Sequence, residues 1–387
     1  MPGTMVRMGR LLVLTAFTWT ALAVQGQSKV CPGDCDANGR TESVEIAAAV
    51  HALFGQAAVC GGETGSASVA FLVQALSYAA LDRPICAAGG RSRWEDLAPL
   101  PGGPRQEVGV AALGDEVFVI GGITSRAVGV STVEAYRVSQ GRWRTVARLP
   151  RPLHHVAATA DERFVYAAGG FAGASFTPVS EVFRYDPTRD VWEPLPPLPL
   201  AVGAAACAVT RRELHVVGGA AGLASSAQHA VLNLDTMTWS TATPLPEALN
   251  HLGAVVWNEN LYVVGGRHDP SGLANSSALY RWDAGTNAWQ TLAPMPTARS
   301  GHAAGVVGRW LVVFGGEVDP LRSPQFVFPQ VEAYDLSRDR WFSDVSMPVP
   351  RHGFGAAVVG TAVYLPGGAT RAGFGETDRH DRWVIEE

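Results

Sequence analysis

Lysine is almost absent from this sequence. Lys29 is the one lysine among 30 basic residues, and no run of basic residues occurs. Charged residues make up only 17% of the chain and the net charge is −5. A nucleic-acid partner is therefore not expected, because proteins that bind nucleic acid carry a basic patch. Beyond the N-terminal region no apolar run reaches the roughly 20 residues of a membrane-spanning helix, so no transmembrane segment is expected.

The N-terminus has the residue order of a secretory signal peptide. Arg7 and Arg10 precede an apolar run from Leu11 to Ala23, and small residues suitable for cleavage follow up to Gly26. The run is shorter than a membrane-spanning helix. We interpret residues 1–26 as a signal peptide, with an uncleaved anchor as the alternative. The protein is then secreted or extracellular, in the periplasm or at the cell surface.

Cysteine is also scarce, and its placement agrees with export. Four of the five cysteines lie within one short segment, and the fifth, Cys207, lies in an apolar run and is expected to be a buried thiol. Clustered cysteines in an exported segment predict two disulfides, and a zinc site is the weaker alternative. Three pairings are open, of which nested closure favours the first with the last. The four are Cys31, Cys35, Cys60 and Cys86.

The same segment contains a calcium-loop pattern. Residues 34–45 match D-x-D-x-N-G followed by an acidic residue at the twelfth position, with Gly39 allowing the sharp turn. Calcium requires six to eight oxygen ligands, which these positions supply in register. The alternative is a solvated acidic turn that caps the following helix. The predicted ligands are Asp34, Asp36, Asn38, the backbone carbonyl of Arg40, Glu42 and Glu45.

Residues 31–86 resemble a dockerin-type module, a small α-helical domain with two calcium-loop–helix repeats. The first loop matches closely, whereas the second, around Gly62–Ser68, keeps only Glu63 as an acidic residue. The resemblance implies calcium as cofactor and a cohesin-like partner. A module with one calcium loop could instead serve as a disulfide-linked spacer. Residues 87–91 then form a linker.

Two residue patterns repeat through the rest of the chain. A glycine doublet follows a β-branched or aromatic run six times, and a tryptophan recurs six times independently, both at spacings of 47 to 52 residues. Agreement between the two series indicates one unit repeated six times. The doublets begin at Gly121, Gly169, Gly218, Gly265, Gly315 and Gly367. The tryptophans are Trp94, Trp143, Trp192, Trp239, Trp289 and Trp341.

Each unit contains four short strand signals separated by turns. Four strands in a period of about 50 residues resemble the kelch repeat, whose architecture is a β-propeller. The fold class is therefore mainly β, a six-bladed kelch propeller over residues 92–387. The last unit is one strand short, while Ser92–Pro101 is a fourth-strand segment without a blade before it. We expect this segment to complete the sixth blade and remove an open sheet edge.

Arginines and histidines recur just before the innermost strands, where the kelch resemblance implies a ligand-binding face. Such groups at one channel mouth suit a carboxylate or sugar hydroxyls. The alternative is that they fix the turn by hydrogen bonds to the backbone. The candidate ligand-binding residues are Arg105, Arg151, His154, His251, Arg299, His302, Arg351 and His352, with His155 beside them. Phe171, Phe176, His268, Asp269 and Phe326 are further candidates on variable loops.

The predicted function is recognition of a glycan or protein ligand at the propeller face by an exported binding protein. Kelch enzymes are the alternative class. Copper-radical oxidases of that kind need a cysteine–tyrosine cross-link with copper ligands, and no matching set is found around Cys207. Sialic-acid mutarotases are six-bladed and use an acidic residue with an arginine, so a mutarotase-like enzyme stays open, as does a structural surface protein.

Overall fold

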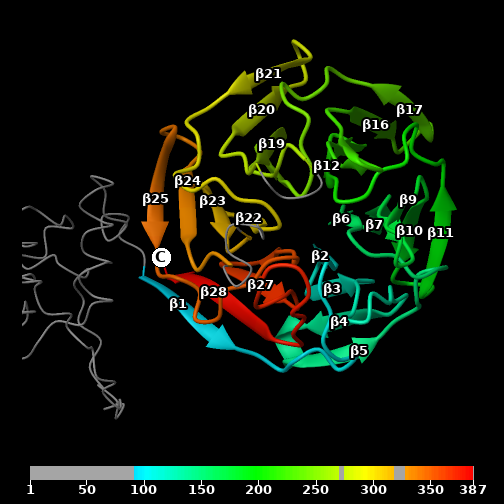
Figure 1. Cartoon of the computed structure of the whole chain (residues 1–387), viewed down its shortest axis with the longest axis vertical. Helices are drawn as coiled ribbons and strands as arrows, with labels where there is room; N and C mark the ends of the chain where they lie inside the picture. Colours follow the sequence, from blue (N-terminus) through cyan, green and yellow to red (C-terminus); the bar gives the residue numbers. More distant parts are fainter. Residues whose placement is uncertain (1–90, 270–273, 318–326, 387) are drawn as a thin grey trace, which may run out of the picture.

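The computed structural model describes residues 91–269, 274–317 and 327–386. Within these ranges the chain contains no α-helix and forms six four-stranded antiparallel sheets arranged around a central axis, as Figure 1 shows. The prediction of a six-bladed propeller is confirmed. The predicted signal peptide, calcium-loop module and disulfide cysteines lie outside the described residues, as does all but the last residue of the predicted linker. No described helix is long and apolar enough to cross a membrane.

The blades follow one another along the chain. Blade 1 contains β2 (Gly109–Leu113), β3 (Glu116–Ile120), β4 (Val133–Arg137) and β5 (Arg142–Thr145), with the 3-10 turn η2 (Val138–Gln140) after β4. Blade 2 contains β6 (Ala157–Ala160), β7 (Val165–Ala168), β10 (Val182–Asp186) and β11 (Val191–Leu195). Blade 3 contains β12 (Ala206–Thr210), β13 (Glu213–Val217), β16 (His229–Asn233) and β17 (Thr238–Thr241).

The other three blades repeat this order. Blade 4 contains β18 (Gly253–Trp257), β19 (Asn260–Val264), β20 (Leu279–Asp283) and β21 (Ala288–Thr291). Blade 5 contains β22 (Ala303–Val307), β23 (Trp310–Phe314), β24 (Val331–Asp335) and β25 (Arg340–Asp344). Blade 6 contains β26 (Ala357–Val359), β27 (Ala362–Pro366), β28 (His380–Glu386) and β1 (Arg91–Asp96). Two small hairpins, β8 (Phe171–Ala172) with β9 (Thr177–Pro178) and β14 (Ala220–Ala221) with β15 (Ala224–Ser225), extend from blades 2 and 3.

Six hydrophobic clusters lie one at each interface between neighbouring blades, and a small seventh joins Phe171, Ala204 and Ala220. The cluster between blades 1 and 2, for example, joins Phe118 of β3 to Tyr185 of β10. Equivalent clusters lie between the other neighbours, including blades 6 and 1. A single four-stranded sheet leaves both faces exposed, so stacking the blades is what buries them. Cys207 lies in the cluster between blades 2 and 3 as a free buried thiol, as predicted.

The repeated tryptophans join each blade to the one before it. Each indole Nε1 donates a hydrogen bond to a backbone carbonyl in the turn after the preceding blade, at 2.7–3.2 Å. Trp143 bonds to the Ala98 carbonyl, and Trp192 bonds to the Ala147 carbonyl. The regular spacing of tryptophan along the sequence therefore reflects one hydrogen bond from each blade to the blade before it.

The ring is closed by the N-terminal strand. β1 pairs antiparallel with β28, and Trp94 lies opposite Trp383 in the register. The Trp94 indole donates a hydrogen bond to the Val345 carbonyl after blade 5, as the other five tryptophans do to the turn after the preceding blade. The innermost strands β26 and β2 are neighbours, which completes the circle. The expected closure by a borrowed N-terminal segment is confirmed.

The glycine doublets form the turn after the second strand of each blade. Gly315 and Gly316 both have positive φ, +61° and +106°, and the N–H of Gly316 donates to the Arg351 carbonyl of the next blade at 2.8 Å. A Cβ added at Gly315 would lie 2.3 Å from that same carbonyl oxygen. The doublet therefore serves both backbone conformation and close approach of two blades.

Replacement of Gly315 by alanine is expected to lower the free energy of unfolding by about 2–4 kcal/mol. Positive φ alone costs a side chain about 1–2 kcal/mol, and the overlap with the Arg351 carbonyl adds to it. Gly308→Ala is the matched control, because Gly308 has φ +57° but no atom within 4 Å of the added Cβ. Denaturant unfolding of both variants tests this, and equal losses would contradict the interblade explanation.

Candidate functional site

One position in each blade forms a closed ring where the chain enters the innermost strand. All six residues have positive φ, between 53° and 62°. The backbone N–H of each donates to the carbonyl of the equivalent residue in the preceding blade, at 2.5–3.0 Å, so six hydrogen bonds run around the axis. We call these residues the mouth ring. They are Glu107, His155, Ala204, His251, Gly301 and Gly353.

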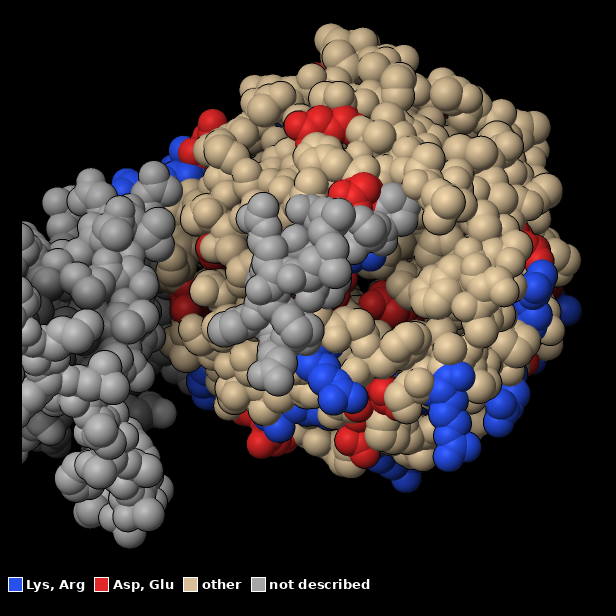
Figure 2. Space-filling view, viewed as in Figure 1, with Lys and Arg blue, Asp and Glu red and all other residues tan. Residues whose placement is uncertain are grey.

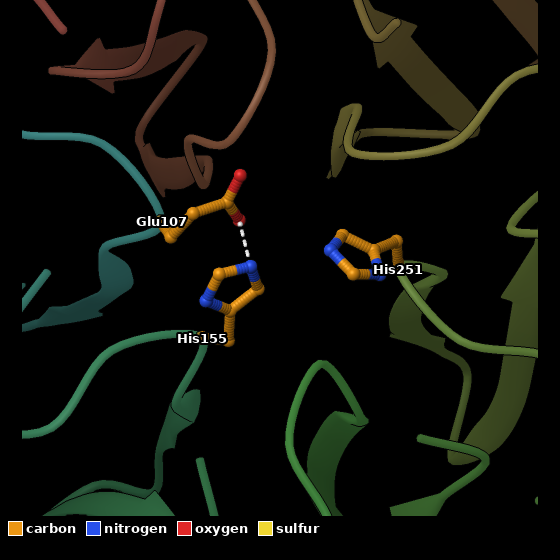
Figure 3. A group of neighbouring side chains, drawn as sticks. All are labelled: Glu107, His155 and His251. Atoms are coloured by element: carbon orange, nitrogen blue, oxygen red, sulfur yellow. Dashed lines mark ion pairs between the residues drawn. The ribbon is translucent and has the colours of Figure 1, made fainter. Parts of the chain in front are cut away.

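Three members of the mouth ring carry chemically active side chains that converge on the axis. Figure 3 shows Glu107 of blade 1, His155 of blade 2 and His251 of blade 4 pointing toward one another. One ligand atom from each lies within 4.8 Å of the others, and His155 Nε2 is 3.3 Å from Glu107 Oε2. Gly353 makes room for the carboxylate, since a Cβ there would lie 2.4 Å from Glu107 Oε1.

A second layer of polar side chains surrounds these three. Arg267 Nη1 contacts Glu317 Oε1 at 2.5 Å, and Arg267 Nη2 lies 3.1 Å from His251 Nε2. His352 Nδ1 is 3.3 Å from Glu317 Oε2 and 3.7 Å from Glu107 Oε1. The side chains of Arg267, Glu317 and His352 are each at most 10% exposed. The mouth therefore holds acids, an arginine and imidazoles within contact of one another.

Burial changes the ionisation of the mouth ring. Desolvation raises the pKa of Glu107 to about 7, with His352 and Arg267 opposing the rise and Glu317 adding to it. Desolvation lowers the pKa of His155 and of His251 well below the usual value, and neighbouring cationic groups lower both further. The two imidazoles are therefore neutral at pH 7 and offer lone pairs rather than positive charge.

Aromatic rings form one wall of the mouth. Phe171 and Phe176 of the β8–β9 hairpin pack on the two histidines of blade 2. Their ring centroids lie 5.3 and 5.5 Å from that of His155. Phe176 is also partly exposed to solvent. This wall keeps water from one side of the histidines and presents an apolar surface to any ligand.

Below the mouth ring lies a cavity of about 150 Å³ along the axis. Its walls come from the first residues of the innermost strands, which are small and mainly apolar. Figure 2 shows a hollow near the centre of the face with acidic side chains visible inside it, while most of the visible arginine side chains lie toward the outer edge of the molecule. The lining includes Gly109, Ala157, Ala206, Gly253, Ala303 and Gly355.

Comparison with protein-family models shows the family of this chain. A family model described as Attractin/LZTR1 beta-propeller matches residues 110–373, which is more than half of the sequence. The chain belongs to this family. The predicted kelch resemblance is thereby confirmed for the propeller, and the kelch propeller suggests a protein-interaction role.

Curated relatives of this Attractin/LZTR1-type propeller are longer proteins, of which two are named kelch-like. Kelch-like protein terF of Aspergillus terreus is 31% identical over 287 residues, which cover 70% of this chain and 62% of the relative. Kelch-like protein 35 of Mus musculus is 36% identical over 135 residues, 33% of this chain and 21% of the relative. Beta-scruin of Limulus polyphemus is 30% identical over 133 residues, 33% of this chain and 14% of the relative. The chain thus spans less than two thirds of each of these relatives.

A solved structure shares the fold of this Attractin/LZTR1-type propeller. The structure of YjhT superposes with a TM-score of 0.64 at 17% sequence identity, covering 75% of this chain and 99% of that chain. At this identity the likeness shows the architecture alone. It agrees with the six blades described above.

Three of the four arginines predicted to bind ligand are buried structural groups in this Attractin/LZTR1-type propeller. Arg105, Arg299 and Arg351 are at most 1% exposed. Each forms an ion pair with an acid on the third strand of its own blade and donates to a backbone carbonyl at the end of the second strand or in the turn after it. The acids are Glu134, Glu332 and Asp381. Their contacts correspond to the alternative of turn fixation rather than to a ligand role.

Arg151 and the histidines have different positions. Arg151 is exposed and pairs with Glu181 at 2.6 Å, away from the mouth ring. His251 belongs to the mouth ring, whereas His154 and His352 are buried beside it, with His154 hydrogen-bonded to its neighbour His155 at 2.6 Å and His352 3.3 Å from Glu317. His302 is buried below the ring and lines the cavity.

Sequence reasoning missed the acidic and basic members of the site. Glu107 occupies the repeat position that is glycine in blades 5 and 6, so alignment of the six units would single it out. Arg267 and Glu317 each directly follow a glycine doublet. The backbone of each forms an isolated β-bridge with a residue of the turn that enters the innermost strand of its blade. That position is apolar in the other four blades, where it holds Ile123, Phe171, Ala220 and Ala369.

Proposed function

We propose that this chain is an exported interaction protein that binds a segment of a partner protein across the face on which the mouth ring opens. The observation that carries the proposal is the apolar character of the loops around that face. Four loops between second and third strands each carry an exposed large apolar side chain. Exposed apolar residues grouped on loops of a rigid scaffold favour a binding surface. They are Val128, Phe176, Leu223 and Phe374.

The loops and the mouth belong to the same face. The first residue of each loop pairs with the turn that enters the innermost strand, as Phe171 does with His154 and Ala220 with Gly203. A partner segment that contacts the apolar tips thus spans the polar mouth. The mouth then selects a polar or charged side chain, while the tips supply apolar contact area, an arrangement typical of protein interfaces.

Peptide and glycan arrays probed with the protein test this proposal. Substitution of Phe176, Leu223 and Phe374 by serine is expected to reduce binding to selected peptides at least tenfold, because the apolar contacts carry the affinity. Leu200→Ser with Val345→Ser is the control, since both side chains are exposed and apolar but lie outside these loops. Binding to glycans alone, or peptide binding that survives the triple substitution, would overturn the proposal.

A carbohydrate-active enzyme of the mutarotase type is the second candidate. The observation that favours it is the convergence of Arg267 with Glu317, His251 and Glu107 at one mouth, since an acid and an arginine near a shared point suit sugar chemistry. Proton NMR of N-acetylneuraminic acid anomers tests it. Faster interconversion that is lost in Arg267→Met supports the enzyme, and an unchanged rate removes it.

We also propose that the N-terminal module, residues 31–86, holds one calcium ion as an adaptor for a cohesin-like partner. The matched loop pattern supports this, as does the requirement of calcium for oxygen ligands. Calorimetric titration of calcium into the full chain is expected to show one site that Glu45→Gln abolishes. Asp115→Asn, an exposed acid in the propeller, is the control. Absence of calcium binding, or equal binding in both variants, would refute the loop.

A further inference from the structure

The side chains of Glu107, His155 and His251 present ligand atoms to one point on the propeller axis. The atoms lie within 4.8 Å of one another. On a tetrahedral zinc ion, bonds of about 2.0–2.2 Å place ligand atoms about 3.3–3.6 Å apart, so the side chains must approach one another by roughly 1 Å to seat an ion. We propose that these three residues form a binding site for a divalent transition-metal ion of the Zn²⁺ class. The site is independent of the partner proposed above.

The hydrogen bonds around His155 leave its inner nitrogen without a proton. His154 Nε2 lies 3.2 Å from the Gly173 carbonyl oxygen, which only accepts, so this nitrogen carries the proton. A neutral imidazole has one N–H, so His154 Nδ1 accepts and His155 Nδ1, at 2.6 Å, donates to it. We therefore assign a bare Nε2 to His155. That lone pair faces Glu107 Oε2 at 3.3 Å.

The environment of His251 fixes the same tautomer. Its Nδ1 lies 2.5 Å from Asn250 Oδ1, which also accepts from Arg267 Nε at 3.1 Å, while the Asn250 amide nitrogen donates to the Arg267 carbonyl at 3.3 Å. The amide oxygen is therefore the acceptor, and His251 Nδ1 carries the proton. Its Nε2 carries no proton, is turned to the axis and accepts a hydrogen bond from Arg267 Nη2 at 3.1 Å. A hydrogen bond from the outer nitrogen to a fixed oxygen is the arrangement that orients metal-binding histidines.

Two acceptors face each other between Glu107 and His155. With Nε2 bare, a carboxylate oxygen 3.3 Å away is repelled unless a cation or a proton lies between the two atoms. Both side chains are at most 10% exposed, so water screens this repulsion poorly. A proton on Glu107 or a metal ion removes the conflict, and of the two the metal ion also binds the lone pair of His251 Nε2.

Arg267 contacts this set through His251 Nε2, and His352 Nδ1 lies 3.7 Å from Glu107 Oε1. An ion that takes the His251 lone pair replaces the hydrogen bond from Arg267 Nη2, whereas the contacts of Arg267 with Glu317 at 2.5 Å and with Asn250 at 3.1 Å involve its other two nitrogens. The negative charge of Glu317 neutralises the positive charge of Arg267. The carboxylate of Glu107 in turn neutralises part of the positive charge of the ion. Two imidazoles and one carboxylate suit zinc, cobalt, nickel or copper and suit calcium or magnesium poorly. The fourth position of the ion faces the mouth, where a ligand atom could join.

Titration of the chelator-treated full chain with ZnCl₂ and with CoCl₂ tests the site. One ion per chain is expected, with affinity lowered at least tenfold in His155→Ala and in His251→Ala, and unchanged in His268→Ala. His268 is the control because it is an exposed histidine of a neighbouring loop. The cobalt spectrum should show histidine and carboxylate ligation without a thiolate charge-transfer band, which separates this site from the N-terminal cysteines.

Asn250→Ala provides a variant that keeps all three ligands. It is expected to weaken zinc binding about 10- to 100-fold by freeing the His251 ring, while the protein stays folded by near-UV circular dichroism. The proposal is overturned by the absence of zinc and cobalt binding, by affinity that the ligand substitutions leave unchanged, or by a cobalt spectrum of thiolate character alone. Failure of the peptide-array experiment leaves this result unaffected, since it concerns the loop tips.

Discussion

Glu134→Ala is expected to lower the free energy of unfolding by about 3–5 kcal/mol. Glu134 Oε2 lies 2.6 Å from Arg105 Nη2, and both side chains are at most 3% exposed. Removing one partner leaves a charge in an apolar interior, which is among the costliest single changes in a protein. Denaturant unfolding of the purified variant measures the loss.

The repeat itself supplies the control for this substitution. Blade 2 has Leu153 and Phe183 where blade 1 has Arg105 and Glu134, and both apolar residues lie in the core between blades 1 and 2. The double variant Arg105→Leu with Glu134→Phe copies that pair. It is expected to recover most of the stability, since apolar pairs replace buried ion pairs at little or no cost. A double variant as unstable as Glu134→Ala would refute the charge explanation.

Removal of β1 is expected to abolish the monomeric fold. A chain that begins at Leu97 lacks the strand that pairs with β28 over six residues, so one blade keeps three strands and an open edge. It also loses the Trp94 contact with blade 5 and the Glu95 carboxylate, which lies 2.6 Å from Arg382. An unprotected edge pairs with other chains, and aggregation follows.

Size-exclusion chromatography and thermal unfolding measure the outcome. A chain that begins at Arg91 is the control, because it keeps β1 and differs by only six residues; it is expected to be a monomer with a cooperative transition. Trp94→Ala is expected to be intermediate, folded but destabilised by about 2–4 kcal/mol through lost packing and one hydrogen bond. A soluble monomer from the Leu97 chain with an unchanged transition would refute closure by β1.

The blade pattern could be predicted because it depends on local chemistry that recurs. Gly315 must be glycine for its positive φ and for the approach of the Arg351 carbonyl, so every blade keeps a doublet at that place. The segment that contains Trp94 is expected to complete the sixth blade, because a unit one strand short needs the strand that precedes the first unit. The glycine doublet depends on residues that recur in every repeat, and the closing strand follows from counting strands in each repeat, so both can be recognised in the sequence.

The roles of the arginines could not be assigned in this way. Arg299 in the sequence is compatible with a ligand or with a turn, and the choice depends on Glu332, more than thirty residues away on another strand. Comparison of the six units shows how the two positions are linked. Arginine occurs at the position of Arg299 only in blades whose third strand has an acid at the position of Glu332. Blade 4 has Leu249 and Tyr280 at these two positions instead. This link between the arginine and the acid can be recognised only when it is known which residues of neighbouring strands lie opposite each other.

The sequence alone determined the number of blades, the order of strands within each and the segment that closes the ring, because spacing, glycine conformation and strand patterning act over short stretches of chain. The tertiary structure decided which side chains meet. Glu107, His155 and His251 belong to blades 1, 2 and 4 and are far apart along the chain, yet the circular arrangement brings equivalent positions of all blades to one narrow axis. Only there do their differences from blade to blade combine into a site.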